Sequence, residues 1–182
     1  MSVLNNKQQM FIVQFPSNFW YDEVVEKWTP MIERMRLPYN NINDFMNAQI
    51  QSVTFPGVTL DSVTQQREQY EITYPGGKEL EVNIDKNIRL TFKLTESYIS
   101  YWIIWDQLDK YLHYVNDHNF KKDCWMEPIE LGFLTDSGFE LTNFKFREIT
   151  PYGLSSLTLS YAATIASYNT FEWSLKYNWF DI

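Results

Sequence analysis

Residues 70–84 alternate apolar and polar side chains on both sides of a Pro-Gly-Gly turn, which is the pattern of a β-hairpin. The predicted turn comprises Pro75, Gly76 and Gly77. One face of the ribbon is apolar, with three residues on each strand: Tyr70, Ile72 and Tyr74 on the first, and Leu80, Val82 and Ile84 on the second. An isolated hairpin is only marginally stable in water. This face must therefore be covered, either by the same chain or by a neighbouring molecule.

The charge of the chain is unfavourable for tight binding to nucleic acid. Its 182 residues include 15 Lys and Arg against 23 Asp and Glu, a net charge of -8, and the one adjacent basic pair is Lys121 and Lys122. Affinity for a phosphate backbone comes from clustered cations, which this sequence lacks. Repulsion of nucleic acid is the more natural consequence of its composition.

The remaining composition predicts a soluble protein made in a cytoplasm. The first nine residues are polar and do not resemble a secretory signal. The longest run of aromatic and aliphatic residues, 101–105, is far too short to span a membrane. The single cysteine, Cys124, excludes an internal disulfide and suits a reducing compartment.

Most of the chain reads as short strands with alternating side chains, and the length suits one domain. The expected strands lie at residues 9–15, 50–55, 89–95, 129–133, 139–141, 157–165 and 171–179, in addition to the hairpin. The apolar phase slips between Leu141 and Phe144, which predicts a bulge or a strand end. About seven or eight strands with one major helix predict an α+β fold, mainly β, with an antiparallel two-sheet sandwich or barrel flanked by that helix.

The strongest helical pattern begins at Thr95 or Ser97 and continues to about His113. It has an apolar stripe at three- and four-residue spacing, and three isoleucines extend the apolar surface around much of the remaining circumference. The stripe is Tyr98, Trp102, Trp105, Leu108 and Leu112, and the isoleucines are Ile99, Ile103 and Ile104. A helix with this pattern is expected to be covered on more than one side.

Residues 17–48 have the pattern of short helices rather than of strands. Ser17 or Asn18 is the expected cap of a first helix that Pro30 interrupts, followed by a helical turn over residues 30–36. Asn43 is the expected cap of a further short helix.

Catalytic and metal-binding patterns are weak. His113 and His118 are five residues apart and do not share a helix face, so a site that combines them with Asp117 and Cys124 is a minor alternative. A phosphate-binding glycine loop is absent from the sequence. We expect no enzymatic activity and no cofactor or metal.

Glu79 and Glu81 have a spacing that a glycosidase pair could use, although both belong to the polar face of the predicted hairpin, where carboxylates are ordinarily solvated. Seven Trp, twelve Tyr and thirteen Phe exceed what a core of this size needs. Tyr and Trp are enriched where protein surfaces meet. They also stack on sugars, so a monomeric carbohydrate-binding β-sandwich module remains an alternative.

Taken in order, these segments resemble the tail tube proteins of long-tailed bacteriophages and, more distantly, the tube subunits of type VI secretion systems. The resemblance begins with Ser-Val-Thr-Phe-Pro-Gly-Val at 52–58 and continues through the hairpin, the strand at 89–95 and the helix at 98–112. It ends with Ile-Glu-Leu-Gly-Phe-Leu-Thr-Asp-Ser-Gly-Phe-Glu-Leu at 129–141, the turn at Pro151 and the aromatic strand at 171–180.

The resemblance implies a structural virion protein that assembles into stacked hexameric rings around a DNA conduit, with the hairpin packed against adjacent subunits or rings. Its implied partners are other copies of the chain and tail proteins such as the sheath, tape measure or baseplate, and its implied location is the phage tail. DNA would pass without specific binding, because polar and acidic side chains repel phosphate. Glu79, Glu81 and Glu172 are the candidate acids at the channel or at a ring junction.

The insertion at 17–48 departs from the tube pattern. This segment suggests an alternative function, a specialised ring of the same fold: a tube initiator, a baseplate hub or a tail terminator. Such a segment is equally expected as a local cap over one end of the sandwich, since loops readily accept insertions.

Overall fold

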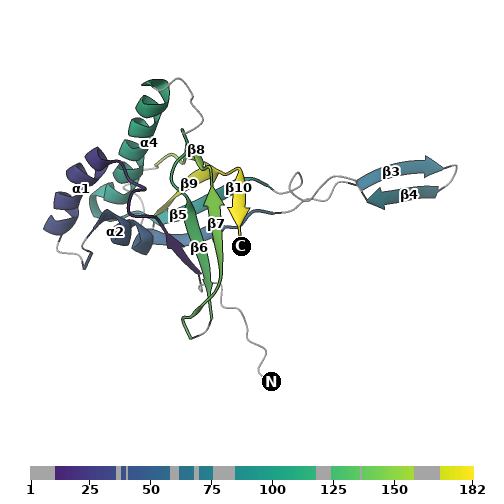
Figure 1. Ribbon diagram of the computed structural model, residues 1–182, viewed down its shortest axis with the longest axis horizontal. Helices are drawn as coiled ribbons and strands as arrows, with labels where there is room; N and C mark the ends of the chain where they lie inside the picture. Colours follow the sequence, from purple (N-terminus) through teal and green to yellow (C-terminus); the bar gives the residue numbers. More distant parts are fainter. Residues whose placement is uncertain are drawn as a thin grey trace, which may run out of the picture.

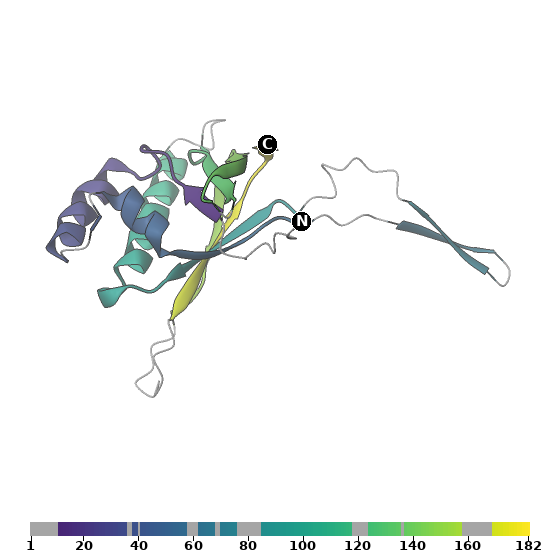
Figure 2. The same ribbon diagram turned by 90° about the horizontal axis from the view of Figure 1, so that it is seen from below.

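The structure is a computed structural model that describes residues 11–35, 38–39, 41–57, 62–67, 70–75, 85–117, 124–135, 137–157 and 169–182. Its described part is mainly β, with two four-stranded sheets, a two-stranded ribbon and helices gathered at one end of the molecule (Figures 1 and 2).

The first sheet, called sheet A, has the strand order β1-β6-β7-β10, and every described pairing in it is antiparallel. Its strands are β1 (Phe11–Gln14), β6 (Ile129–Leu134), β7 (Glu140–Arg147) and β10 (Trp179–Asp181). A bulge separates the pairs Phe133 with Thr142 and Leu134 with Glu140, so Leu141 is the extra residue. The phase slip in the sequence correctly predicted an irregularity beside Leu141, because one unpaired residue shifts every following side chain to the other face.

The second sheet, called sheet B, has the order β2-β5-β9-β8 and is also antiparallel. Its strands are β2 (Ile50–Thr54), β5 (Asn87–Lys93), β8 (Thr150–Leu154) and β9 (Thr170–Lys176). Alternation decides which side is inside: Ile88, Leu90 and Phe92 are buried on β5, and Phe171, Trp173 and Leu175 are buried opposite them on β9. The rings of Phe92 and Phe171 stack at 5.4 Å between centroids.

The inner faces of both sheets belong to one hydrophobic core. Leu131 and Phe146 contribute from sheet A, and Leu90 and Trp173 from sheet B. The two-sheet arrangement predicted from the strand pattern is therefore confirmed. The part of the chain expected as a strand at 157–165 lies almost entirely outside the described residues.

Helices α1 (Asp22–Arg34) and α2 (Ile42–Gln49) occupy most of the 17–48 insertion, and they pack into the same core as the sheets. Three details of the prediction were wrong. Helix α1 begins at Asp22 with Tyr21 at its N-cap, so neither Ser17 nor Asn18 caps it. Pro30 lies inside α1 rather than ending it, because Val24, Trp28 and Ile32 bury one continuous face across the proline, which offsets the lost backbone hydrogen bond. Asn41 rather than Asn43 caps α2, and its side-chain oxygen accepts a hydrogen bond from the Asp44 amide at 2.7 Å.

The long helix α4 (Ile99–Asp117) follows a single 3-10 turn, η1 (Glu96–Tyr98), and packs beside α1. Its buried side includes Ile99, Ile103, Ile104 and Tyr111. The buried side chain of Gln107 joins α4 to the start of the insertion. Its Nε2 donates to the Phe19 carbonyl at 2.9 Å, and its Oε1 accepts from the Tyr21 amide at 3.1 Å.

Strands β3 (Ser62–Arg67) and β4 (Tyr70–Pro75) form a ribbon that lies apart from both sheets, at the end of the molecule opposite to the helices (Figures 1 and 2). The ribbon is called the arm below. The sequence prediction missed β3 as the partner of β4. Residues 62–67 contain one apolar side chain, Val63, so their pattern carries no alternating apolar signal.

Candidate assembly surfaces

The arm exposes an apolar face. Its register pairs Val63 with Tyr74, Gln65 with Ile72 and Arg67 with Tyr70, and directly opposed residues of an antiparallel pair share a face. Val63, Tyr70, Ile72 and Tyr74 therefore lie together, and between 38% and 76% of each is exposed. The opposite face is polar, with Ser62, Thr64, Gln66, Glu71 and Thr73. Aromatic and aliphatic residues gathered on one exposed face are typical of an interaction surface.

The structure places only part of the predicted hairpin surface. Tyr70, Ile72 and Tyr74 lie on one face of β4, as the alternation predicted, and Pro75 ends the strand. The rest of the predicted set lies outside the described residues: Gly76, Gly77, Glu79, Leu80, Glu81, Val82 and Ile84. Their role at an interface or a ring junction stays a prediction.

A second apolar surface runs along α4. The side chains of Tyr98, Trp102, Trp105 and Leu112, called the α4 stripe below, are between 37% and 58% exposed. Trp102 and Trp105 contact each other edge to face, at 6.3 Å between ring centroids. The sequence pattern, whose stripe also includes Leu108, predicted that this helix is covered on more than one side. The structure instead buries the side that carries the isoleucines, because these aliphatic side chains fit the core, and the bulkier aromatic residues remain outside.

A third apolar region lies between the two sheets at the edge strands β1 and β2. Each of these strands has one hydrogen-bonded neighbour among the described strands, so each has a free edge. A groove of about 330 Å³ opens between them, lined by Phe11, Ser52, Val53, Phe55, Leu131 and Phe133. The exposed Phe55 ring, which lines this groove, contacts Phe144 at 4.9 Å between centroids. Free edges beside an open seam are suited to pairing with another chain.

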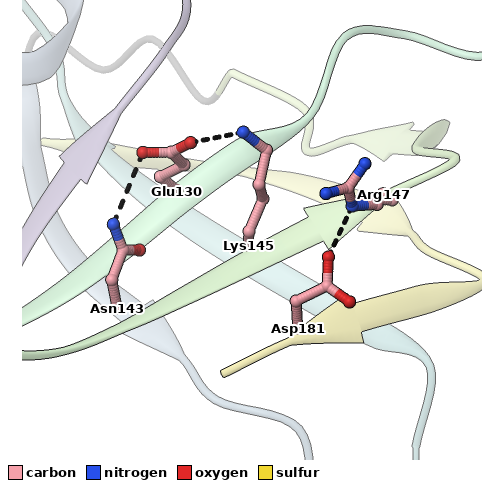
Figure 3. Close-up of polar contacts among 5 residues, drawn as sticks. All are labelled: Glu130, Asn143, Lys145, Arg147 and Asp181. Carbon is pink, nitrogen blue, oxygen red and sulfur yellow. Dashed lines mark hydrogen bonds and ion pairs between the residues drawn. The ribbon is translucent and has the colours of Figure 1, made fainter.

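The outer face of sheet A carries charged side chains that pair with one another (Figure 3), beside the exposed side chains of Ile12 and Trp179. Lys145 on β7 donates to Glu130 on β6 at 2.7 Å, and Arg147 Nε lies 2.5 Å from Asp181 Oδ2 on β10. Asn143 donates a longer hydrogen bond to the second Glu130 oxygen, at 3.4 Å. The hydrogen bond from Lys145 is the largest cause of the lowered pKa of Glu130. These cross-strand pairs neutralise each other, so this face presents little net charge.

The outer face of sheet B differs in charge from the rest of the molecule. Glu172 lies there, exposed on β9 and opposite Thr91, on the face that also carries Arg89, Lys93 and Lys176. Lys176 Nζ lies 4.2 Å from the centre of the Tyr152 ring. The described side chains of this face are therefore more cationic than anionic. The acid excess lies instead on α1, α2 and α4, which together carry eight carboxylates and three Lys or Arg.

The described residues contain no group of three His, Cys, Asp or Glu side chains that could hold a metal ion. His113 Nδ1 lies 2.7 Å from the Asp109 carbonyl oxygen, on the exposed side of α4. Cys124 is a half-buried free thiol, and His118 lies outside the described residues. Among the helices that the structure describes, none is long and apolar enough to cross a membrane.

Sequence reasoning missed the exposure of the α4 stripe, the strand β3 and the cation-rich face of sheet B. For the last of these a signal existed, because Arg89, Lys93 and Lys176 all fall on the polar phase of predicted strands. The pairing of β5 with β9, which brings these three cations to one face, cannot be read from either strand alone.

No protein-family model matches the chain, and no curated protein matches it in sequence. Several solved structures are similar to it. The tube-terminating cap of the anti-feeding prophage is 12% identical, with a TM-score of 0.46, over 96% of this chain and 88% of the cap chain. The sheath-tube complex of the extracellular contractile injection system PVC contains a chain 17% identical, with a TM-score of 0.44, over 96% and 88%. An Hcp protein is 12% identical, with a TM-score of 0.42, over 93% and 89%.

Proposed function

We propose that this chain is a structural subunit of a tail tube, whose copies associate into stacked rings of six around a channel that conducts DNA. The observation that carries the proposal is the arm, whose apolar face is exposed in the single chain and requires cover. The free edges of β1 and β2 support it, since closing a ring of subunits removes exposed sheet edges.

In this proposal the chain acts by shape and association and has no catalytic step. Its partners are other copies of itself and other tail proteins such as the sheath, tape measure or baseplate. It is assembled in the host cytoplasm and resides in the phage tail. Glu172, together with Glu79 and Glu81, is offered to the channel or to a ring junction. For Glu172 the ring junction is favoured, because its face also carries Arg89, Lys93 and Lys176 and would attract phosphate rather than repel it.

The insertion supports a second candidate, a specialised ring at the start, hub or end of a tube. Helices α1 and α2 add a layer over α4 and β1 that a repeating tube subunit does not require, and their side chains belong to the main core rather than to a separate lobe. A subunit of this kind would form closed rings that do not extend into tubes.

Electron microscopy of the purified full-length protein over a concentration series tests these proposals. Long tubes support the repeating subunit, and isolated rings support the specialised ring. Sedimentation should show a shift to large species as the concentration rises. A compact monomer at all concentrations, above all one that binds a glycan array, would overturn the proposal in favour of a carbohydrate-binding module.

A further inference from the structure

We propose that the arm of one copy lies along the α4 stripe of the next copy, so that the two exposed apolar surfaces cover each other. This inference rests on the proposed function, because it names the contact that joins the copies. The arm contributes Val63, Tyr70, Ile72 and Tyr74, and the stripe contributes Tyr98, Trp102, Trp105 and Leu112.

The position of the two surfaces excludes mutual cover within this conformation of one chain. The arm lies at one end of the longest axis of the molecule, and α4 lies among the helices at the other end (Figures 1 and 2). We therefore infer that a second copy of this chain covers each of the two surfaces.

The two surfaces match in length and in chemistry. Ten residues separate Trp102 from Leu112 within α4, which corresponds to about 15 Å along the helix, and Tyr98 lies in the 3-10 turn just before it. The apolar face of the arm runs from Tyr70 to Tyr74, which corresponds to about 14 Å along a strand. Both surfaces are rich in aromatic side chains, which bury a large apolar area and form favourable edge-to-face contacts with one another.

The area of the contact predicts how it behaves. A partly exposed side chain of this size offers roughly 100 Å², so eight such side chains remove roughly 800 Å² from water. That value is below the ~1,200–2,000 Å² of a stable interface, so an isolated pair of copies dissociates readily. In a ring every copy is held on two sides, and the second contact forms at a high effective concentration. The contact is thus weak between two copies and strong in a closed assembly.

The contact has a direction. When the arm of one copy occupies the stripe of a second, the arm of the second copy and the stripe of the first remain free. Such a head-to-tail interface produces rings where the rotation closes and open filaments where it does not. A symmetric arm-to-arm contact would stop at a dimer.

The test uses two full-length variants that each lose one surface. The arm variant combines Tyr70→Asp and Tyr74→Asp, and the stripe variant combines Trp102→Glu and Trp105→Glu. All four side chains are exposed, so both variants should retain the circular dichroism spectrum and melting behaviour of the natural chain. Thr73→Asp on the polar face of the arm, and Leu141→Glu on the exposed bulge of β7, are matched controls that should assemble normally.

Each variant alone should sediment as a monomer. Because one contact is weak, an equimolar mixture should form a one-to-one heterodimer that dissociates on dilution and grows with protein concentration, and nothing larger. The intact arm then belongs to the stripe variant, and the intact stripe belongs to the arm variant. A mixture that remains monomeric even at the highest attainable protein concentration, or a stripe variant that still assembles like the natural chain, overturns the inference.

Disulfide trapping adds a direct readout of the weak contact. In a Cys124→Ser background, copies with Tyr74→Cys mixed with copies with Trp105→Cys should cross-link rapidly, and Thr73→Cys copies should not. Equal cross-linking of both arm positions contradicts the proposed face. If the natural chain forms rings while the stripe variant does so equally well, the inference fails and the proposed function stands; if the natural chain never assembles, both fail.

Discussion

Replacing Gln107 with methionine should strongly destabilise the fold, because this side chain satisfies two backbone groups at once. Gln107 is 1% exposed. Its amide donates to the Phe19 carbonyl at 2.9 Å and accepts from the Tyr21 amide at 3.1 Å. Methionine has a similar length and keeps the packing volume, so the substitution removes the two hydrogen bonds without opening a large cavity.

The magnitude follows from the groups left without partners. An unsatisfied buried donor or acceptor costs about 1–3 kcal/mol, and the variant creates one of each, partly offset by easier burial of the methionine. We expect the free energy of unfolding to fall by about 2–4 kcal/mol. For a chain of this length, that corresponds to a melting temperature lower by about 5–15 °C.

Urea denaturation followed by tryptophan fluorescence measures this change, since Trp20 and Trp28 lie in the layer that Gln107 attaches to α4. Gln51→Met on exposed strand β2 is the control, and it should change the stability by less than about 0.5 kcal/mol. If Gln107→Met differs from the natural chain by no more than this control, Gln107 does not hold the insertion on the helix, and the reasoning is refuted.

Three further predictions concern polar groups. Glu130 has a lowered pKa in the folded chain, so the stability it provides is present above the ordinary carboxyl pKa and is lost as the pH falls through the folded value. Lys145→Met should therefore lower the free energy of unfolding at neutral pH and match the natural chain in strong acid. A difference in this free energy that stays constant with pH would contradict the prediction. Burial raises the pKa of Tyr177 from 10.0 to about 12, so the contribution of its neutral form to stability is complete below pH 10 and is lost as the pH rises toward 12. Chemical denaturation between pH 10 and 12 should therefore show a smaller loss of stability in Tyr177→Phe than in the natural chain. Asp106→Ala removes the hydrogen-bond acceptor that lies 2.7 Å from the indole nitrogen of buried Trp28. The free energy of unfolding, measured by chemical denaturation, should fall by about 1–3 kcal/mol. An unchanged denaturation midpoint would contradict this prediction.

The sequence was sufficient to predict the strands that alternate cleanly. On β5 and β9 every second residue is large and apolar, and the structure buries those residues in register with one another. The bulge was predictable for the same reason, since Leu141 breaks the alternation on β7. In these segments the local pattern and the tertiary packing agree, so the one-dimensional signal is enough.

The helix α4 shows where such a signal fails. Its sequence is apolar over most of its circumference, so periodicity identifies a helix but does not select the face that packs. The choice depends on the shape of the core it meets, which accepts Ile103 and Ile104 at 0% exposure and leaves Trp105 outside. For the arm the sequence signal fails for another reason. Strand β3 is stabilised by its hydrogen bonds to β4 and has almost no apolar pattern of its own.

The distribution of charge gives the proposed contact its selectivity. The helices carry eight carboxylates and three cationic side chains, so two copies that approach helix to helix repel each other. The strands of the arm contain one arginine and one glutamate, and Glu71 lies on the face away from Tyr74, so an arm that approaches the same helices meets no comparable repulsion. This difference favours arm-to-helix over helix-to-helix association at low ionic strength. Because salt screens exposed charges beyond about 10 Å at 0.1 M, the preference should weaken as salt is added, while the apolar contact itself remains.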